Sequence, residues 1–251
     1  MANTSDRIIG WFSCGVTSAV ACKLALQDYG NVEIVYIDAG GMHPDSYRFL
    51  HDCEKWFGRQ IRIVRSDKYD SAIDVWRDRK YINGISGAPC TYWLKRKVRW
   101  KLEDEWGEWK GQVFGFDISE KKRAQRFREQ NPKAKAVYPL IKHSLTKPEC
   151  MALLRRHGIK IPEMYSLGFH NNNCIGCCKG NRGYWNLIRK RFPLMFNDVA
   201  RLERELGHSC INGVFLDELD PKLIEKPIVE QCSLYCDVDF MDVEDNKLAH
   251  P

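Results

Sequence analysis

The sequence lacks the features that mark membrane-spanning and exported proteins. No stretch approaches the roughly 18 uninterrupted apolar residues that a transmembrane helix needs, and residues 1–7 do not form the charged start of a signal peptide. The sequence also contains no internal repeat, low-complexity tract or linker. We therefore expect a folded cytoplasmic protein that makes no contact with a membrane.

The composition excludes a disordered chain. Hydrophobic residues make up 44% and charged residues of both signs 29% of the sequence, which is enough apolar material for a core. A length of 251 residues is compatible with one large α/β domain or with a domain plus an appendage. Since 39 Lys and Arg face 33 Asp and Glu, the net charge of +6 favours anionic partners such as nucleotides without requiring a nucleic acid.

Cysteine is abundant, but its use argues against disulfides. The total of 11 is odd, and the chain shows no secretory signal, so reduced thiols are expected. Free cysteine packs as a small hydrophobic side chain. We predict a core position for four cysteines that lie in helical patterns or beside apolar runs: Cys22, Cys53, Cys150 and Cys210.

A different role is predicted for the polar, glycine-punctuated segment 171–180. There Cys174 and Cys177 form a Cys-x-x-Cys motif that can place two thiolates on one metal or cluster. The motif is half a site, so the remaining ligands must come from distant positions. The available thiols are those of Cys90, Cys232 and Cys236.

Strand and helix patterns alternate over the first half of the chain. Apolar runs predict strands over residues 7–12, 32–37, 60–64, 112–115 and 136–138, with helical patterns between them. This alternation predicts the α/β class with an open, mainly parallel sheet flanked by helices. From Thr146 onward the signals are helical. We expect an α/β domain over residues 1–145 and a helical, cysteine-containing C-terminal region over residues 146–251 packed on it.

The loops after the first two strands are candidate ligand sites, because open parallel sheets bind ligands beyond the carboxyl ends of their strands. Residues 13–18, Ser-Cys-Gly-Val-Thr-Ser, combine hydroxyl donors with a glycine that lets a phosphate or sulfate approach. The spacing and the lysine of a Walker loop are absent, and a capped helix start is the alternative. In residues 38–45 a glycine pair can admit a flat ring, or Asp45 can cap the next helix.

These motifs, taken in order, resemble the phosphoadenosine phosphosulfate (PAPS) reductase family. The resemblance covers residues 7–180 and rests on the ordered set Ser13-x-Gly15-x-x-Ser18, Asp38 to Asp45, Gly115-x-x-x-x-Glu120-x-x-Arg123, Tyr138-Pro139-Leu140 and Gly168 to Cys177. It implies an adenine nucleotide α-hydrolase-like (PP-loop) fold and an enzyme of sulfur metabolism, with a homodimer as one possible assembly.

The resemblance also implies a division of labour within a nucleotide site. Residues 13–18 would hold the phosphate or sulfate end, residues 38–41 would line the adenine and ribose pocket, and the pair at 120 and 123 would close the site. A basic helix could add cationic contacts, with a solvated basic face as the alternative. The nucleotide-binding residues so implied are Ser13, Gly15, Thr17, Ser18, Asp38, Gly40, Gly41, Lys95, Glu120 and Arg123.

The loop of residues 13–18 also indicates the class of substrate. ATP-consuming members of the superfamily carry Ser-Gly-Gly-x-Asp-Ser, in which the Asp helps to manage pyrophosphate and magnesium. This chain has Thr17 at that position, and the pattern is nearer to that of sulfonucleotide reductases. The resemblance therefore implies an oxidoreductase that acts on PAPS or adenylylsulfate.

The cysteines imply a metal centre by the same resemblance. Adenylylsulfate reductases with a 4Fe–4S cluster use a Cys-Cys pair and a later Cys-x-x-Cys, and here Cys90 supplies one thiol of the former. The fourth position would be open or filled by Cys178, Cys232 or Cys236. We predict the ligand set Cys90, Cys174, Cys177 and Cys236, with zinc as the alternative to iron.

Two other functions stay open. Three-cysteine clusters serve related tRNA-thiolating enzymes, so an ATP-dependent sulfurtransferase acting on a nucleic acid or a small molecule is the alternative; a non-catalytic nucleotide or cluster sensor is a third. The family's reductases end in a Glu-Cys-Gly tail, whose thiolate attacks sulfur and is resolved by a thioredoxin-like reductant. Residues 230–233, Glu-Gln-Cys-Ser, match this tail imperfectly, and we predict Cys232 as the nucleophile.

Overall fold

The computed structural model describes residues 6–84 and 87–229. They divide into two compact units that are interleaved in sequence. The first takes in the chain up to Asp38, Met42–Arg65 and Trp100–Leu167, and the second takes in Ala39–Gly41, Ser66–Arg99 and the chain from Gly168 onward. The domain boundary that we expected at residue 145 stays a prediction, and these compact units do not follow it.

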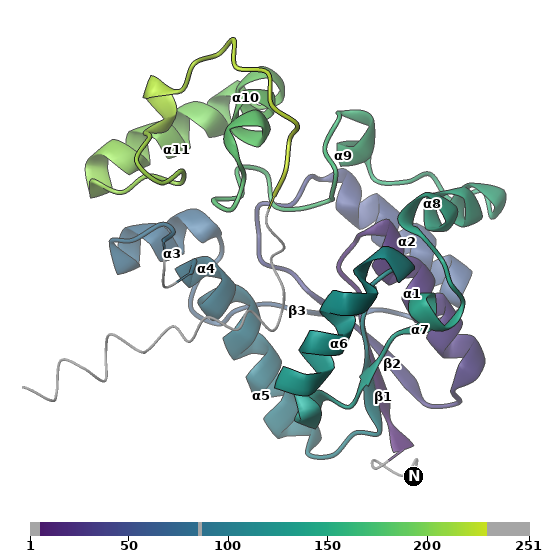
Figure 1. Ribbon diagram of the computed structural model, residues 1–251. Coiled ribbons are helices and arrows are strands. Elements are labelled where there is room, and N and C mark those ends of the chain that lie inside the picture. Colours follow the sequence, from purple (N-terminus) through teal and green to yellow (C-terminus); the bar gives the residue numbers. More distant parts are fainter. Residues whose placement is uncertain (1–5, 85–86, 230–251) are drawn as a thin grey trace, which may run out of the picture. The chain divides into compact units, whose positions relative to one another are not determined.

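The first unit is built on a five-stranded sheet with the order β3-β2-β1-β4-β5, in which every pairing is parallel (Figure 1). The sequence pattern had predicted this class of sheet, and the structure confirms it. β1 is fully buried, and β2 is buried except at Glu33, as expected for central strands of a parallel sheet that is covered on both faces. The strands are β1 (Ile8–Trp11), β2 (Val32–Ile37), β3 (Arg62–Val64), β4 (Gly111–Val113) and β5 (Ala136–Val137).

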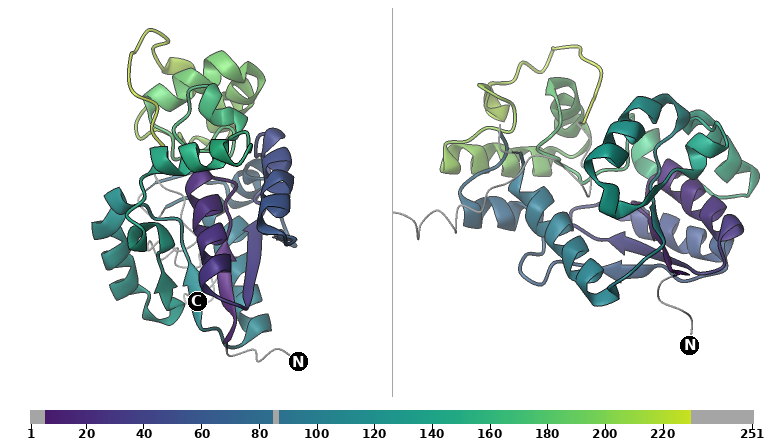
Figure 2. Two further views of the ribbon diagram at one scale, coloured as in Figure 1. Left: turned by 90° about the vertical axis from the view of Figure 1, so that its right-hand side faces the viewer. Right: turned by 60° about the horizontal axis from the view of Figure 1, so that its bottom comes forward.

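Helices cover both faces of this sheet (Figures 1 and 2). On one face α1 (Val16–Asp28) packs against α2 (Asp45–Phe57), α7 (Pro139–Lys142) and α8 (Lys147–Arg156). On the other face Trp11 of β1 meets Trp106 at the end of α5 (Lys97–Trp106), with ring centroids 6.0 Å apart. The remaining helices of the unit are α6 (Lys121–Gln130) and α9 (Glu163–Ser166).

The second unit is helical. It contains α3 (Ala72–Arg79), α4 (Pro89–Thr91), a π-helical turn over Tyr92–Arg96, α10 (Arg182–Arg191) and α11 (Pro193–Leu206). The helical C-terminal part that the sequence predicted is confirmed. The basic helix that the sequence predicted around Lys95 consists of the π-helical turn followed by α5. Among the described residues, no helix is both long and apolar enough to cross a membrane.

The structural cysteines occupy the core as predicted. Cys22, Cys53, Cys150 and Cys210 are all buried, and every described cysteine is a free thiol. Cys210 follows α11, where the fully buried carboxylate of Glu203 accepts hydrogen bonds from the backbone amides of Cys210 (2.5 Å) and Leu216 (2.7 Å). A buried carboxylate bonded in this way fixes the loop that leaves the helix.

Candidate functional site

The loop between β1 and α1 leaves the start of the helix uncapped. Gly15 is the residue before the first helical turn, and it has no side chain with which to cap that turn. The Oγ of Ser18 instead accepts from the amide of Ser13 at 3.0 Å and donates to the carbonyl of Gly15 at 2.9 Å. The alternative of a helix capped by Ser or Thr is therefore not what the structure contains. The amides of the first turn are oriented to receive an anion, as helix N-termini are.

The end of β4 approaches this loop closely. A Cβ atom at Gly115 would lie 2.8 Å from the backbone nitrogen of Ser18 and 2.9 Å from its Cα. Only glycine leaves room for the chain after β4 to touch the first turn of α1. The loops after β1 and β4 therefore meet where the strand order reverses, since the chain turns from β1 to β2 on one side and returns to β4 on the other.

Tyr165, from later in the sequence, contacts the same loop, and Lys147 lies beside Tyr165. The hydroxyl of Tyr165, in α9, accepts a hydrogen bond from the amide of Val16 at 3.4 Å. The ammonium group of Lys147, the first residue of α8, lies 5.3 Å from the centre of the Tyr165 ring. Neither residue could be identified from the sequence, because no local pattern links them to the loop; Tyr165 lies 149 residues after Val16.

Asp38, at the end of β2, is a buried carboxylate held by two partners. It accepts a hydrogen bond from the hydroxyl of Tyr47, and its Oδ2 lies 2.5 Å from the guanidinium of Arg65. The side chain of Asp38 is 2% exposed, whereas that of Arg65 is 62% exposed. Burial and the neighbouring Asp38 charge raise the pKa of Tyr47, so its hydroxyl stays a donor. The carboxylate is thereby fixed, and its predicted role beside the adenine and ribose stays a prediction.

Glu120 and Arg123 form an ion pair at the carboxyl end of β4. The Arg123 guanidinium donates to Glu120 at 2.6 Å and lies 4.5 Å from the centre of the Phe116 ring. The other Glu120 oxygen accepts from the amide of Asp117 at 3.3 Å, which completes a reciprocal cap of the turn that leads into α6. The Glu120–Arg123 pair is therefore fixed near Gly115. Its predicted role in closing the nucleotide site stays a prediction.

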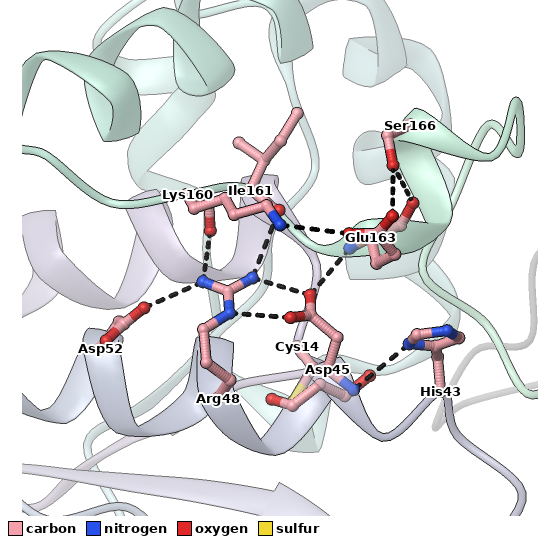
Figure 3. Close-up of polar contacts among 10 residues, drawn as sticks. Cys14, His43, Asp45, Arg48, Asp52, Lys160, Ile161, Glu163 and Ser166 are labelled. Carbon is pink, nitrogen blue, oxygen red and sulfur yellow. Dashed lines mark hydrogen bonds and ion pairs between the residues drawn. The ribbon is translucent and has the colours of Figure 1, made fainter.

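Asp45 and Arg48 brace the segment that carries Tyr165 (Figure 3). Arg48 donates two hydrogen bonds to Asp45, and it also donates to the carbonyl oxygens of Lys160 (2.7 Å) and Ile161 (3.3 Å). Asp45 in turn accepts from the amide of Glu163 at 2.8 Å. Asp45 does not itself occupy the cap position of α2, which is Pro44. Its main role in the structure is to join α2 to the start of α9.

Replacing Arg48 by methionine is expected to lower the free energy of unfolding at pH 7 by about 1–2 kcal/mol, since several partners lose their donor. The Arg48 hydrogen bonds hold the pKa of Asp45 below its ordinary value. That contribution is present above the ordinary aspartate pKa and is lost as pH falls through the lowered folded-state pKa, so the difference between R48M and wild type shrinks towards pH 3. Urea unfolding at both pH values measures this.

The control for R48M is R201M, since Arg201 pairs with Asp198 and is 68% exposed. Its expected effect is within about 0.5 kcal/mol at either pH. Equal losses from the two substitutions would contradict a bracing role for Arg48.

In the second unit the Cys-x-x-Cys turn is held by Tyr184 of α10. The Tyr184 hydroxyl accepts from the amide of Cys177 at 2.9 Å and donates to the carbonyl of Cys174 at 3.0 Å. Gly180 packs so closely on the Tyr184 ring that a Cβ there would lie 1.9 Å from a ring carbon. Tyr184 therefore fixes the backbone of the turn.

Further thiols gather at this turn. The sulfurs of Cys90 and Cys178 lie 3.9 Å apart. The hydrogen bond with Cys178 lowers the pKa of Cys90, and Trp76 and the charges of Lys95 and Lys179 act in the same direction against burial. The thiols of Cys177 and Cys210 interact electrostatically with this pair. Even so, no three His, Cys, Asp or Glu side chains within residues 6–84 and 87–229 are arranged to hold one metal ion.

The other predicted site residues are distributed as follows. Gly40 and Gly41 adopt positive φ angles of 66° and 69°, and a Cβ at Gly40 would lie 2.0 Å from the carbonyl oxygen of Asp70. The carbonyl of Gly41 accepts from the amide of Ile175 at 2.8 Å, which ties this loop to the cysteine turn. Lys95 lies in the π-helical turn of the same unit. The predicted nucleophile Cys232 and the predicted ligand Cys236 lie outside the described residues.

Comparison with known proteins shows a shared fold. No protein-family model matches the chain. An uncharacterized protein of Methanocaldococcus jannaschii is 25% identical over 203 residues, which are 77% of this chain but 41% of that protein, so the chain spans about two fifths of its relative. The crystal structure of a PAPS reductase from Candida auris, in a phosphate complex, superimposes with a TM-score of 0.51 at 14% identity, covering 66% of this chain and 80% of that one. The protein therefore has the α/β fold of PAPS reductase, as the motifs implied.

Proposed function

We propose that the protein binds an adenylated nucleotide and reduces its sulfuryl group. The observation that carries this proposal is the uncapped N-terminus of α1 at the reversal point of the sheet, in a chain with the fold of PAPS reductase. A helix start at this position favours a phosphate or sulfate group by its orphan amides and its dipole. Ser13, Gly15, Thr17 and Ser18 would bind that group, with Asp38 and the Glu120–Arg123 pair near the same strand ends.

The proposed reaction has three steps. The Cys232 thiolate attacks the sulfur of the sulfonucleotide, the bond from sulfur to the phosphate oxygen breaks, and the adenosine phosphate leaves with the electron pair. A dithiol reductant of the thioredoxin type then attacks the Cys232 sulfur and releases sulfite. Its second thiol frees Cys232, so the reductant ends as a disulfide and sulfur has gained two electrons.

Iron–sulfur clusters and structural zinc both take thiolates, so the thiols of the second unit have the chemistry of metal ligands, but the described ones would have to rearrange to hold one metal ion together. The nearby charges of Lys95 and Lys179 would offset thiolate charge. We propose Cys90, Cys174, Cys177 and Cys236 as ligands of a 4Fe–4S cluster, with zinc as the alternative. When bound, such a cluster supplies electron-transfer chemistry or, at an iron without a protein ligand, a site for sulfide.

The gathering of thiols also supports a second candidate, an ATP-dependent sulfurtransferase. Cys178 and Cys210 add to the thiols around Cys90, and a reductase that uses a single tail nucleophile does not need them. This candidate requires ATP, magnesium and pyrophosphate release, whereas the reductase requires a dithiol and releases sulfite. The two functions therefore differ in product.

The test is anaerobic purification with iron, sulfide and zinc quantitation, followed by both product assays. We expect sulfite release from PAPS or adenylylsulfate with reduced thioredoxin, abolished in C232S and retained in C53S, whose cysteine is buried in α2. Pyrophosphate release from ATP without sulfite release would favour the sulfurtransferase. Protein that binds no adenine nucleotide at millimolar concentration would overturn both.

A further inference from the structure

Lys147 holds an unusual position for a lysine. It is the first residue of α8, whose start is closed by a reciprocal cap between Thr146 and Glu149. Its own backbone amide donates to the Asp117 carboxylate at 3.1 Å, which fixes the helix start to the chain after β4. α8 also packs along α1. The Lys147 backbone is therefore held between α1, which follows the loop of residues 13–18, and the chain after β4.

The side chain lies beside a tyrosine that contacts that loop. The ammonium group lies over the Tyr165 ring, 5.3 Å from its centre, and the hydroxyl of that ring bonds the amide of Val16. A Cβ on Gly15 would lie 3.8 Å from the same hydroxyl. Lys147 and Tyr165 therefore stand as a layered pair beside the first turn of α1.

The charges around Lys147 and Tyr165 favour an anionic ligand. Residues 13–18 contain no lysine or arginine, so the loop itself brings no cation to a bound anion. Burial lowers the pKa of Lys147 to about 8, while the charges of Asp117 and Glu120 act in the opposite direction. An anion placed at the loop would add a further negative charge near the ammonium and favour its protonated form.

We propose that Lys147 is the cation that binds the phosphate or sulfate end of the nucleotide at the α1 loop, with the Tyr165 hydroxyl as a second donor. This inference rests on the proposed nucleotide binding and deepens it. Lys147 takes the place that a lysine inside the loop fills in a Walker motif, but it comes from another helix. Lys147 recognises the anionic end of the ligand, so it adds nothing to the affinity for adenosine alone.

The test compares ATP, PAPS and adenosine by isothermal titration with wild type, K147M, K147R and Y165F. We expect K147M to weaken ATP and PAPS about 10- to 100-fold, as loss of a charged hydrogen bond does, with adenosine unchanged. K147R keeps the charge and should recover most of the affinity. Y165F should weaken the two anions a few-fold. K142M is the matched control, since Lys142 is exposed and pairs with Asp28.

The outcomes separate this inference from the proposed function. If wild type and K147M bind ATP and PAPS equally well, the role of Lys147 is wrong while nucleotide binding stands. If wild type binds none of the three ligands, the proposed function fails and the role of Lys147 with it. If K147M does not fold by circular dichroism, Y165F decides through the ratio of PAPS to adenosine affinity. A lower ratio than in wild type supports the proposal, and an unchanged ratio contradicts it.

Discussion

Replacing Gly115 by alanine is expected to abolish most nucleotide binding and to lower the free energy of unfolding by about 1–3 kcal/mol, the usual cost of overpacking. The added Cβ would lie 2.8 Å from the nitrogen of Ser18 and 3.0 Å from the carbonyl carbon of Thr17. Both are backbone atoms at a helix start, so neither can rotate away as a flexible side chain would. Either the chain after β4 or the first turn of α1 has to move.

Either movement displaces the amides that we propose bind the anion. Titration with ATP and PAPS, together with urea unfolding, measures the two effects. G30A is the matched control, because Gly30 lies between α1 and β2 and a Cβ there meets nothing within 4 Å. G30A should keep full affinity. Retention of wild-type affinity in G115A would show that the loop and the chain after β4 are not coupled in binding.

The second large effect is expected for C90S. Cys90 is the partner of Cys178 at 3.9 Å and is our proposed metal ligand from the segment before α5. Serine keeps the size of the side chain but is a poor ligand for iron or zinc. We expect C90S to lose about 100-fold or more in metal affinity, and sulfite release to fall with it.

Metal content per chain and the visible absorption spectrum measure this loss independently of activity. C53S is the control: Cys53 is fully buried in the first unit, so this variant should be less stable but keep its metal. A C90S protein with wild-type metal content and spectrum would remove Cys90 from the ligand set. Wild-type protein without iron or zinc would instead remove the metal centre altogether.

The sequence was informative where a signal is local. Alternating strand and helix patterns predicted the parallel sheet, because buried parallel strands are continuous apolar runs bounded by turns. The loop of residues 13–18 was found for the same reason, since hydroxyls and a glycine directly follow the first strand. Cys174 and Cys177 were recognisable by their spacing alone.

Contacts between distant segments left no such signal. Tyr165 contacts the loop of residues 13–18, and Lys147 lies beside Tyr165, because of how α8 and α9 pack. Nothing in the residues that flank them indicates these contacts. Arg65 directly follows β3, so it could be recognised as a partner of Asp38 only from the pairing of β3 with β2. The π-helical turn at Tyr92–Arg96 was also missed, because its composition is that of an ordinary helix.

The interleaving of the two units has a consequence for synthesis of the chain. The first unit is not complete until Leu167 has been made, by which time Ala39–Gly41 and Ser66–Arg99 have already emerged. Those early segments have to wait for the residues from Gly168 onward before their own unit can close. The apolar side chains of α3, such as Trp76 and Val75, are buried in the finished unit, where α3 contacts α11. A ribosome stalled near residue 167 should therefore expose them, and the nascent chain at that length should be a preferred client of chaperones.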